Sequence, residues 1–129
     1  MASRAKDWLA QAEHDLRHAQ NAMRDGDYDW ACFAAHQGAE KAVKALLLAR
    51  GAEGWGHSVL KLLRELESAM PIPAQLFEAG RRLDRHYIPT RYPNGFDWGS
   101  PKDYLWSRGC SKGRGGWPSY LRLLRARDL

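Results

Sequence analysis

The sequence has few of the features that mark secreted, membrane-spanning or metal-binding proteins. It holds two cysteines in 129 residues, Cys32 and Cys110, which are too few for a disulfide framework or a zinc site. Its longest apolar runs, such as residues 45–49, are far shorter than the roughly 20 residues that span a bilayer. The N-terminus leads directly into an amphipathic pattern instead of a secretion signal. We therefore expect a cytoplasmic protein that has no membrane contact, no metal site and no cofactor.

The sequence also lacks the alternation of apolar and polar residues that marks β-strands. It contains no glycine-rich phosphate-binding loop and no Ser/His/Asp arrangement, so the common nucleotide-binding loops and serine hydrolases are not indicated. A length of 129 residues suggests one domain with one core, and a hydrophobic content of 44% is ordinary for a globular protein. These properties favour an all-α domain.

Positive charge is concentrated at one end of the chain. Residues 1–101 hold 13 Lys or Arg and 13 Asp or Glu, whereas residues 102–129 hold 7 and 2. The net charge of +5 therefore belongs entirely to the last 28 residues. A basic protein is often a nucleic-acid binder, but here the charge says nothing about the first hundred residues.

Apolar residues recur at intervals of three and four along four segments, which predicts four helices. Gly26 and Gly51 follow the first two and are expected to form left-handed C-caps, while Ser58 is expected to cap the third. The predicted helices cover about residues 3–25, 28–50, 59–70 and 74–88. Short connections between them predict an up-and-down bundle of four to five helices.

The second helix combines a broad apolar surface with a polar patch. Its many alanines and Gly38 would let a neighbouring helix approach closely, which is expected of a central helix. The patch has two interpretations: it lines a dimer groove or ligand cleft, or it is exposed, with the residues at 36 and 40 paired at i, i+4. Its members are His36, Gln37, Glu40 and Lys41. His57 is expected to serve the helix start beside Ser58.

The end of the chain departs from the rest in composition. Ser100 and Pro101 are suited to begin a helix, but several glycines then interrupt it, and alanine falls from 17 in residues 1–101 to one in residues 102–129. We divide the chain into a bundle of residues 1–104 and an atypical basic tail of residues 105–129. Two interpretations of the tail stay open: a flexible basic segment, or a segment read in a shifted frame.

Four blocks of the sequence, taken together, resemble the HEPN domain (higher eukaryotes and prokaryotes nucleotide-binding). The blocks are residues 7–16, 32–47, 56–63 and 83–94, and the resemblance covers about residues 5–104. It implies an all-α bundle of four or five helices that commonly dimerises. Many prokaryotic members are encoded beside a minimal nucleotidyltransferase in a toxin–antitoxin-like pair. Some members are metal-independent ribonucleases with an Arg-x(4–6)-His motif, and others bind nucleotides without catalysis.

Arg81 and His86 match the ribonuclease motif and are the candidate catalytic residues. A histidine suits the task of removing a proton from a ribose 2′-hydroxyl, and an arginine suits a charged phosphate. Because the two positions are five apart, they point roughly 140° away from each other on a straight helix. They would cooperate only across a dimer interface or at a distorted helix end. The alternative is a surface row in which Glu78, Arg82 and His86 pair at i, i+4.

The segment after this motif is the candidate ligand-binding element. Tyr87, Arg91, Tyr92 and Asn94 combine aromatic rings and a positive charge in a segment that holds two prolines, which would suit contact with a base and a phosphate. The alternative for Tyr87 is a core position. Two functions follow: a nucleotide- or RNA-interacting partner of a nucleotidyltransferase, in its strongest form a ribonuclease, or a non-catalytic interaction module. In both cases we expect a homodimer.

Overall fold

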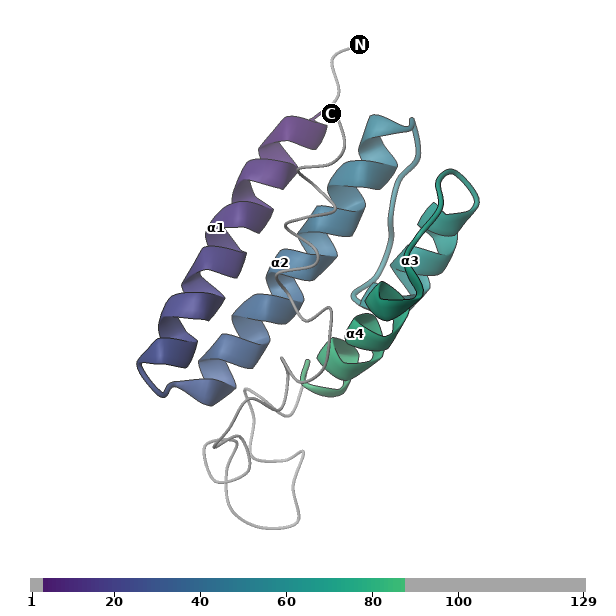
Figure 1. Cartoon of the computed structure of the whole chain (residues 1–129). Helices are drawn as coiled ribbons and strands as arrows, with labels where there is room; N and C mark the ends of the chain where they lie inside the picture. Colours follow the sequence, from purple (N-terminus) through teal and green to yellow (C-terminus); the bar gives the residue numbers. More distant parts are fainter. Residues whose placement is uncertain (1–3, 88–129) are drawn as a thin grey trace.

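A computed structural model of the protein describes residues 4–87, which form four α-helices (Figure 1). The helices are α1 (Ala5–Arg24), α2 (Tyr28–Ala49), α3 (Val59–Glu67) and α4 (Ala74–Arg85). The long helices α1 and α2 lie side by side, and the shorter α3 and α4 pack on the other side of α2 (Figure 1). The predicted all-α bundle is confirmed, with α2 at its centre. None of the described helices has the length and apolar character needed to cross a membrane.

The contact between α1 and α2 depends on small residues. The 3/4 spacing of Leu9, Ala12, Leu16, Ala19 and Met23 predicts one apolar stripe along α1. The three middle members of this stripe are fully buried. A Cβ atom placed on Gly38 would lie 2.6 Å from Cγ of Leu16, so glycine is the residue that allows this close approach. The stripe is less complete at its ends, because Leu9 and Met23 are only partly buried.

The helix ends follow the predicted chemistry in most places. Gly26 and Gly51 have positive φ angles of 81° and 77° and close the ends of α1 and α2. The hydroxyl of Ser58 accepts a hydrogen bond from the Lys61 amide at 3.1 Å, which makes it the N-cap of α3. Asp27 occupies the N-cap position of α2, but its side chain makes no capping bond.

Helix α4 is shorter than predicted, since the sequence pattern predicted a helix that continues to residue 88. It ends at Arg85, and His86 and Tyr87 then donate backbone hydrogen bonds three residues back, to Leu83 and Asp84. Such a tightened turn is common at helix ends. The two residues that follow α4 therefore have a defined course beside the bundle.

The connection between α2 and α3 runs back along α2 before α3 begins (Figure 1). A Cβ on Gly54 would lie 2.9 Å from Cδ1 of Leu47 and 2.8 Å from Cδ2 of Leu62, so the returning chain is pressed against both helices. As a result, the N-terminus of α3 lies beside the middle of α2 and the C-terminal end of α4. Three elements far apart in the sequence meet there.

We predict that Gly38→Ala destabilises the protein. Alanine is favoured over glycine in a helix by about 1 kcal/mol, but overpacking at a filled interface costs about 1–3 kcal/mol. Because Leu16 is fully buried and cannot move aside freely, we expect a net loss of about 1 kcal/mol in the free energy of unfolding. Urea unfolding followed by circular dichroism measures it.

The matched control places the same substitution in a Leu16→Ala background, where the obstructing side chain is absent. There the penalty should shrink or change sign, since the gain in helix propensity remains. A Gly38→Ala protein that is more stable than the parent in both backgrounds would contradict the account of the α1–α2 contact.

Candidate functional site

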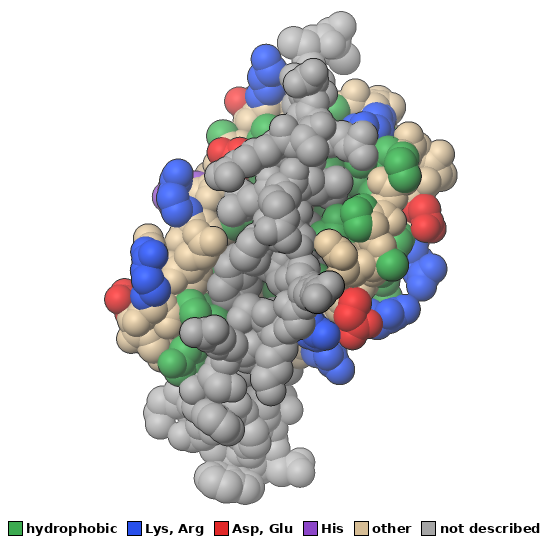
Figure 2. Space-filling model, in the orientation of Figure 1, with side chains coloured by type: hydrophobic (Ala, Val, Ile, Leu, Met, Phe, Trp, Pro, Cys, Tyr) green, Lys and Arg blue, Asp and Glu red, His purple; other side chains and the backbone are tan. Residues whose placement is uncertain are grey.

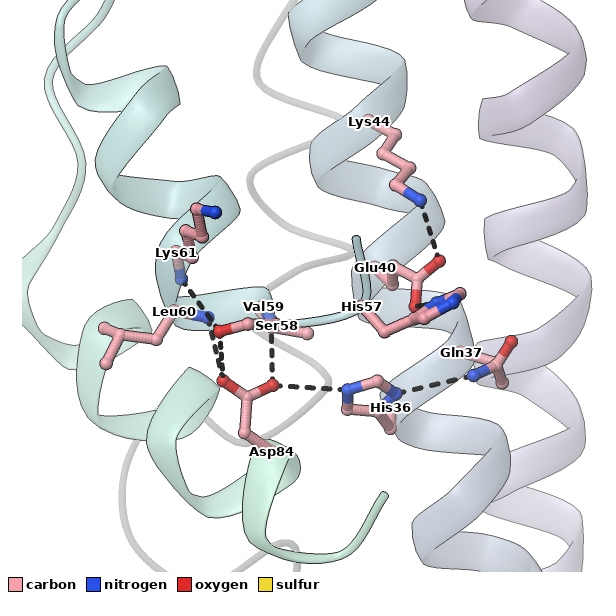
Figure 3. Close-up of polar contacts among 10 residues, drawn as sticks. All are labelled: His36, Gln37, Glu40, Lys44, His57, Ser58, Val59, Leu60, Lys61 and Asp84. Atoms are coloured by element: carbon pink, nitrogen blue, oxygen red, sulfur yellow. Dashed lines mark hydrogen bonds and ion pairs between the residues drawn. The ribbon is translucent and has the colours of Figure 1, made fainter. Parts of the chain in front are cut away.

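The carboxylate of Asp84, near the end of α4, caps the N-terminus of α3 (Figure 3). It accepts hydrogen bonds from the backbone amides of Val59 at 2.7 Å and Leu60 at 3.1 Å. It also accepts from the Ser58 hydroxyl at 2.9 Å and lies 3.2 Å from Nε2 of His36. This set of contacts, which we call the Asp84 cap, joins α4, α3 and α2 at one point. It satisfies amides that have no partner within their own helix.

The hydrogen bonds of the Asp84 cap stabilise the charged form of the carboxyl group. Burial alone would raise the pKa of Asp84, because it disfavours the charged form. The bonds from the His36 ring, the two α3 amides and Ser58 act in the opposite direction and prevail, so the pKa lies below its ordinary value. The group is therefore a carboxylate at neutral pH and contributes its stabilisation in that form.

His36 is an internal residue of the bundle. Its side chain is fully buried, and its two ring nitrogens face Asp84 at 3.2 Å and Nε2 of Gln37 at 3.5 Å. Since a carboxylate only accepts, Nε2 of His36 carries the proton, and Nδ1 is left to accept from Gln37. The expectation that His36 is exposed and paired with Glu40 is wrong. A tertiary partner on α4 replaces the neighbour one turn away.

Glu40 is also buried, and its two oxygens are both engaged (Figure 3). Nζ of Lys44 donates to one oxygen at 3.0 Å, and Nδ1 of His57 lies 3.1 Å from the other. His57 therefore ties the returning connection to α2. The prediction that His57 serves the start of α3 is wrong, because Ser58 and Asp84 carry out that task.

Tyr87 packs between two histidine rings. Its ring centroid is 4.7 Å from that of His36 and 5.3 Å from that of His57, and it is stacked on His57 at an interplanar angle of 15°. Phe33 of α2 lies at 6.4 Å on the same cluster. This packing supports the interpretation of Tyr87 as a residue that helps to hold the fold. The stack also fixes the chain immediately after His86.

The two candidate catalytic residues lie in different surroundings at the end of α4. Arg81 is half-exposed and pairs with Glu78 at 3.3 Å, and Arg82 approaches the same carboxylate at 3.7 Å. His86 is half-buried at the helix end, where burial and the nearby charge of Arg85 lower its pKa below the ordinary value. The row of ion pairs that includes Glu78 and Arg82 thus forms, while His86 has a separate environment.

The remaining candidates, Arg91, Tyr92 and Asn94, lie outside the described residues, as do Cys110 and the whole basic tail. Both interpretations of the tail and the ligand-binding assignment of these three residues therefore stay predictions. Within residues 4–87, basic and acidic side chains are interspersed along both flanks of the face seen in Figure 2. The described residues therefore present charges of both signs along these flanks.

The sequence reasoning missed Asp84 as the residue that organises this region. One signal was available: an aspartate in the last turn of a helix is disfavoured by the helix dipole, which attracts cations there. An acid at such a position indicates a specific partner elsewhere. His36 and Glu40 give a related signal, because they lie on the apolar central helix and buried polar groups require hydrogen-bond partners.

Comparison with known proteins identifies relatives of the chain. The family model for the HEPN domain matches residues 5–107. The structure is similar to that of TT1696 from Thermus thermophilus, with a TM-score of 0.88 and 44% identity over 97% of this chain and 98% of that chain. It is also similar to ST0689, an archaeal HEPN homologue, with a TM-score of 0.77 and 36% identity over 97% and 98% of the two chains.

A third similar structure is that of TM0613, a HEPN domain protein from Thermotoga maritima. Its TM-score is 0.72, with 32% identity over 93% of this chain and 95% of that chain. No curated protein sequence matches the chain.

We predict that Asp84→Asn lowers the free energy of unfolding at pH 7 by about 1–3 kcal/mol, the range for charged hydrogen bonds and helix caps. The asparagine keeps the shape but not the charge, and its amide group faces donors. Because the pKa of Asp84 is lowered in the folded state, the stabilisation is complete above the unfolded pKa and is lost as pH falls through the folded value. The difference between the two proteins should therefore shrink from roughly pH 4 downward.

Urea unfolding at a series of pH values provides the measurement. The control is Asp7→Asn, which removes an exposed ion pair with Arg4 and should change stability by less than about 1 kcal/mol. Equal losses for the two variants, or a difference that does not depend on pH, would argue against the Asp84 cap.

Proposed function

The chain belongs to the HEPN domain family, and from this premise we propose that it is a nucleotide- or RNA-interacting component of a prokaryotic two-gene system whose other member is a minimal nucleotidyltransferase. In its strongest form the proposal assigns the protein a metal-independent ribonuclease activity of the kind found in toxin–antitoxin pairs. Its catalytic residues would be Arg81 and His86. The support comes from the end of α4.

The observation that carries the proposal is the state of His86. A lowered pKa keeps its imidazole neutral at pH 7, and a neutral imidazole is the form that accepts a proton. Burial is the larger cause of the lowered pKa and the charge of Arg85 the smaller. Three arginines lie within the last five residues of α4, at positions 81, 82 and 85, so a polyanion would meet positive charge beside this base.

The corresponding reaction needs no metal or cofactor. His86 would remove the proton of a ribose 2′-hydroxyl, and the resulting oxygen would attack the adjacent phosphorus. The bond from phosphorus to the 5′-oxygen would break, and that oxygen would take up a proton from water, so the products are a 2′,3′-cyclic phosphate and a 5′-hydroxyl. Arg81 would stabilise the additional negative charge on the phosphate in the transition state.

A homodimer would reconcile this chemistry with the geometry of α4. Arg81 is half-exposed on the side of Glu78, whereas His86 is half-buried at the helix end. In the dimer that we propose, Arg81 of one subunit would face the substrate held by His86 of the other. The site would then form only on association, and a monomeric variant would be inactive.

One observation favours the second candidate function, a non-catalytic interaction module. Glu78 engages both Arg81 and Arg82, so the arginine of the motif already has a partner. In this case the chain would present its segment at 87–94 to the nucleotidyltransferase or to a nucleotide, with Tyr87 as the anchor that fixes where the segment starts. The proposals differ in whether RNA is cut.

The first test compares RNA cleavage by the full-length protein with cleavage by its His86→Ala and Arg81→Ala variants. We expect loss of general base catalysis to reduce the rate by roughly 10²–10⁴-fold in the histidine variant. His14→Ala, which alters an exposed histidine of α1, is the control and should cleave at the parent rate. Cleavage that survives His86→Ala would contradict the assignment of His86 as the base, and no cleavage by any of the proteins would leave the interaction module as the function.

The pH dependence of cleavage provides a second test. Since the pKa of His86 is lowered, activity should persist below pH 6.5, the ordinary histidine value, and should fall only as pH drops through the lowered pKa. Replacing Arg85 by Gln removes one cause of the shift, so the acid limb should move to higher pH. An acid limb that is unchanged in Arg85→Gln would separate the activity from His86.

A further inference from the structure

A cleft opens where the connection that returns along α2 passes the start of α1. Its volume is about 450 Å³, within the range of small-molecule sites of roughly 300–1,000 Å³. Its lining comprises two tryptophans, two glycines, one leucine and three polar residues. These are Trp8, Lys44, Leu48, Glu53, Gly54, Trp55, Gly56 and His57.

Trp55 is the unusual member of this lining. Its side chain is 74% exposed, the largest exposure among the large apolar residues of the described part of the chain. The other indole of the cleft, that of Trp8, has Nζ of Lys44 at 5.9 Å from its ring centroid. Within residues 4–87 no ring, cation or hydrogen-bonding group is paired with Trp55. Tryptophan suits a binding surface because its ring buries a large apolar area while its N–H group can bond to a polar partner.

The loop that carries Trp55 is held in place on both sides. Gly54 is packed so closely against α2 and α3 that a Cβ would collide with Leu47 and Leu62. Gly56 adopts a positive φ angle of 84°, which side chains other than glycine rarely allow. His57, the next residue, is tied to the buried Glu40 and stacked on Tyr87. The indole is thus presented on a pre-organised loop, which reduces the ordering cost of binding.

The charges of the cleft are unfavourable for a phosphate. Lys44 is already neutralised by its bond to Glu40 at 3.0 Å, and Glu53 adds a further negative charge to the lining. A purely aliphatic side chain is also a poor match, since Leu48 is the single aliphatic residue in the lining. The combination suits a flat ring with polar edges: one face stacks on an indole, and N–H groups at the edge donate to the Glu53 carboxylate.

From these observations we infer that the Trp55 cleft binds a nucleobase, with Trp55 as its stacking surface and Glu53 as the acceptor for its N–H groups. The inference relies on the proposed function only for the class of ligand, a nucleotide or RNA. It adds a site separate from the Arg81 and His86 motif. The stack of His57 on Tyr87 lies between the cleft and the end of α4, so a base in the cleft would anchor a strand whose backbone continues toward His86.

The experiment follows the indole N–H signals of the full-length protein by NMR while guanosine is added. The signal of Trp55 is assigned by its disappearance in Trp55→Ala. We expect saturable shifts of this signal and of the Gly54 and Gly56 amides, with no response to ribose 5-phosphate. The affinity should change little with salt, because no phosphate contact is made.

Trp55→Ala should weaken guanosine binding by roughly tenfold or more, as for other base-stacking residues. Glu53→Gln should also weaken it, since the charged acceptor is lost. Trp30→Ala is the matched control: Trp30 is the other exposed tryptophan of the described residues, at 56%, and its replacement should leave the affinity unchanged. Circular dichroism shows whether each variant keeps its fold.

Four results would overturn the inference: no shift at Trp55 with guanosine, equal losses for the two tryptophan variants, competition by ribose 5-phosphate, or a response of Trp55 to an apolar peptide but not to guanosine. The two proposals fail separately. Cleavage that requires His86 without guanosine binding at Trp55 would keep the ribonuclease and reject the cleft. Guanosine binding at Trp55 without cleavage would keep the cleft and reject the ribonuclease.

Discussion

The Asp84 carboxylate at the N-terminus of α3 is the interaction on which the arrangement of the second half of the bundle depends. Helix α3 has nine residues, fewer than the roughly 12–15 at which an isolated helix becomes even marginally stable in water. The Asp84 carboxylate accepts hydrogen bonds from the first amides of α3. Its negative charge also interacts favourably with the positive N-terminal end of the α3 dipole. At the same time it holds the end of α4 against α2 through His36. One side chain thus sets the relative positions of three helices.

The Asp84 cap also determines the geometry of the two candidate sites. His86 and Tyr87 come two and three residues after Asp84, so the cap determines where the candidate base and the histidine–tyrosine stack lie. Ser58, on the other side of the cap, follows His57 directly and therefore fixes the returning connection. The position of Trp55 depends on that connection in turn. Both the α4 end and the Trp55 cleft are consequences of the same polar cluster.

Local patterns in the sequence predicted most of the fold. Helix interiors, the glycines after α1 and α2, and the Ser58 cap follow from spacing and backbone chemistry within a few residues, and Gly38 indicated the close α1–α2 contact. The polar residues of α2 were not predictable in this way. The i, i+4 rule pairs His36 with Glu40, but both are buried, and their partners, Asp84 and His57, lie 48 and 17 positions away. Only the tertiary fold brings those groups together.

The candidate catalytic pair was also predictable only in part. The spacing of Arg81 and His86 was visible in the sequence, and so was their unfavourable angle on a straight helix. The burial that is the main cause of the lowered pKa of His86 was not visible, because it depends on packing of the end of α4 against the rest of the bundle.

The most direct test of this account is amide hydrogen exchange at Val59 and Leu60, the two α3 amides bonded to Asp84. In the parent protein we expect both to be protected, although such first-turn amides normally exchange quickly because they lack helical partners. In Asp84→Asn, their protection should fall sharply, while the amides of the α1–α2 contact keep theirs. Unchanged protection of Val59 and Leu60 in the variant would contradict the central role of the Asp84 cap.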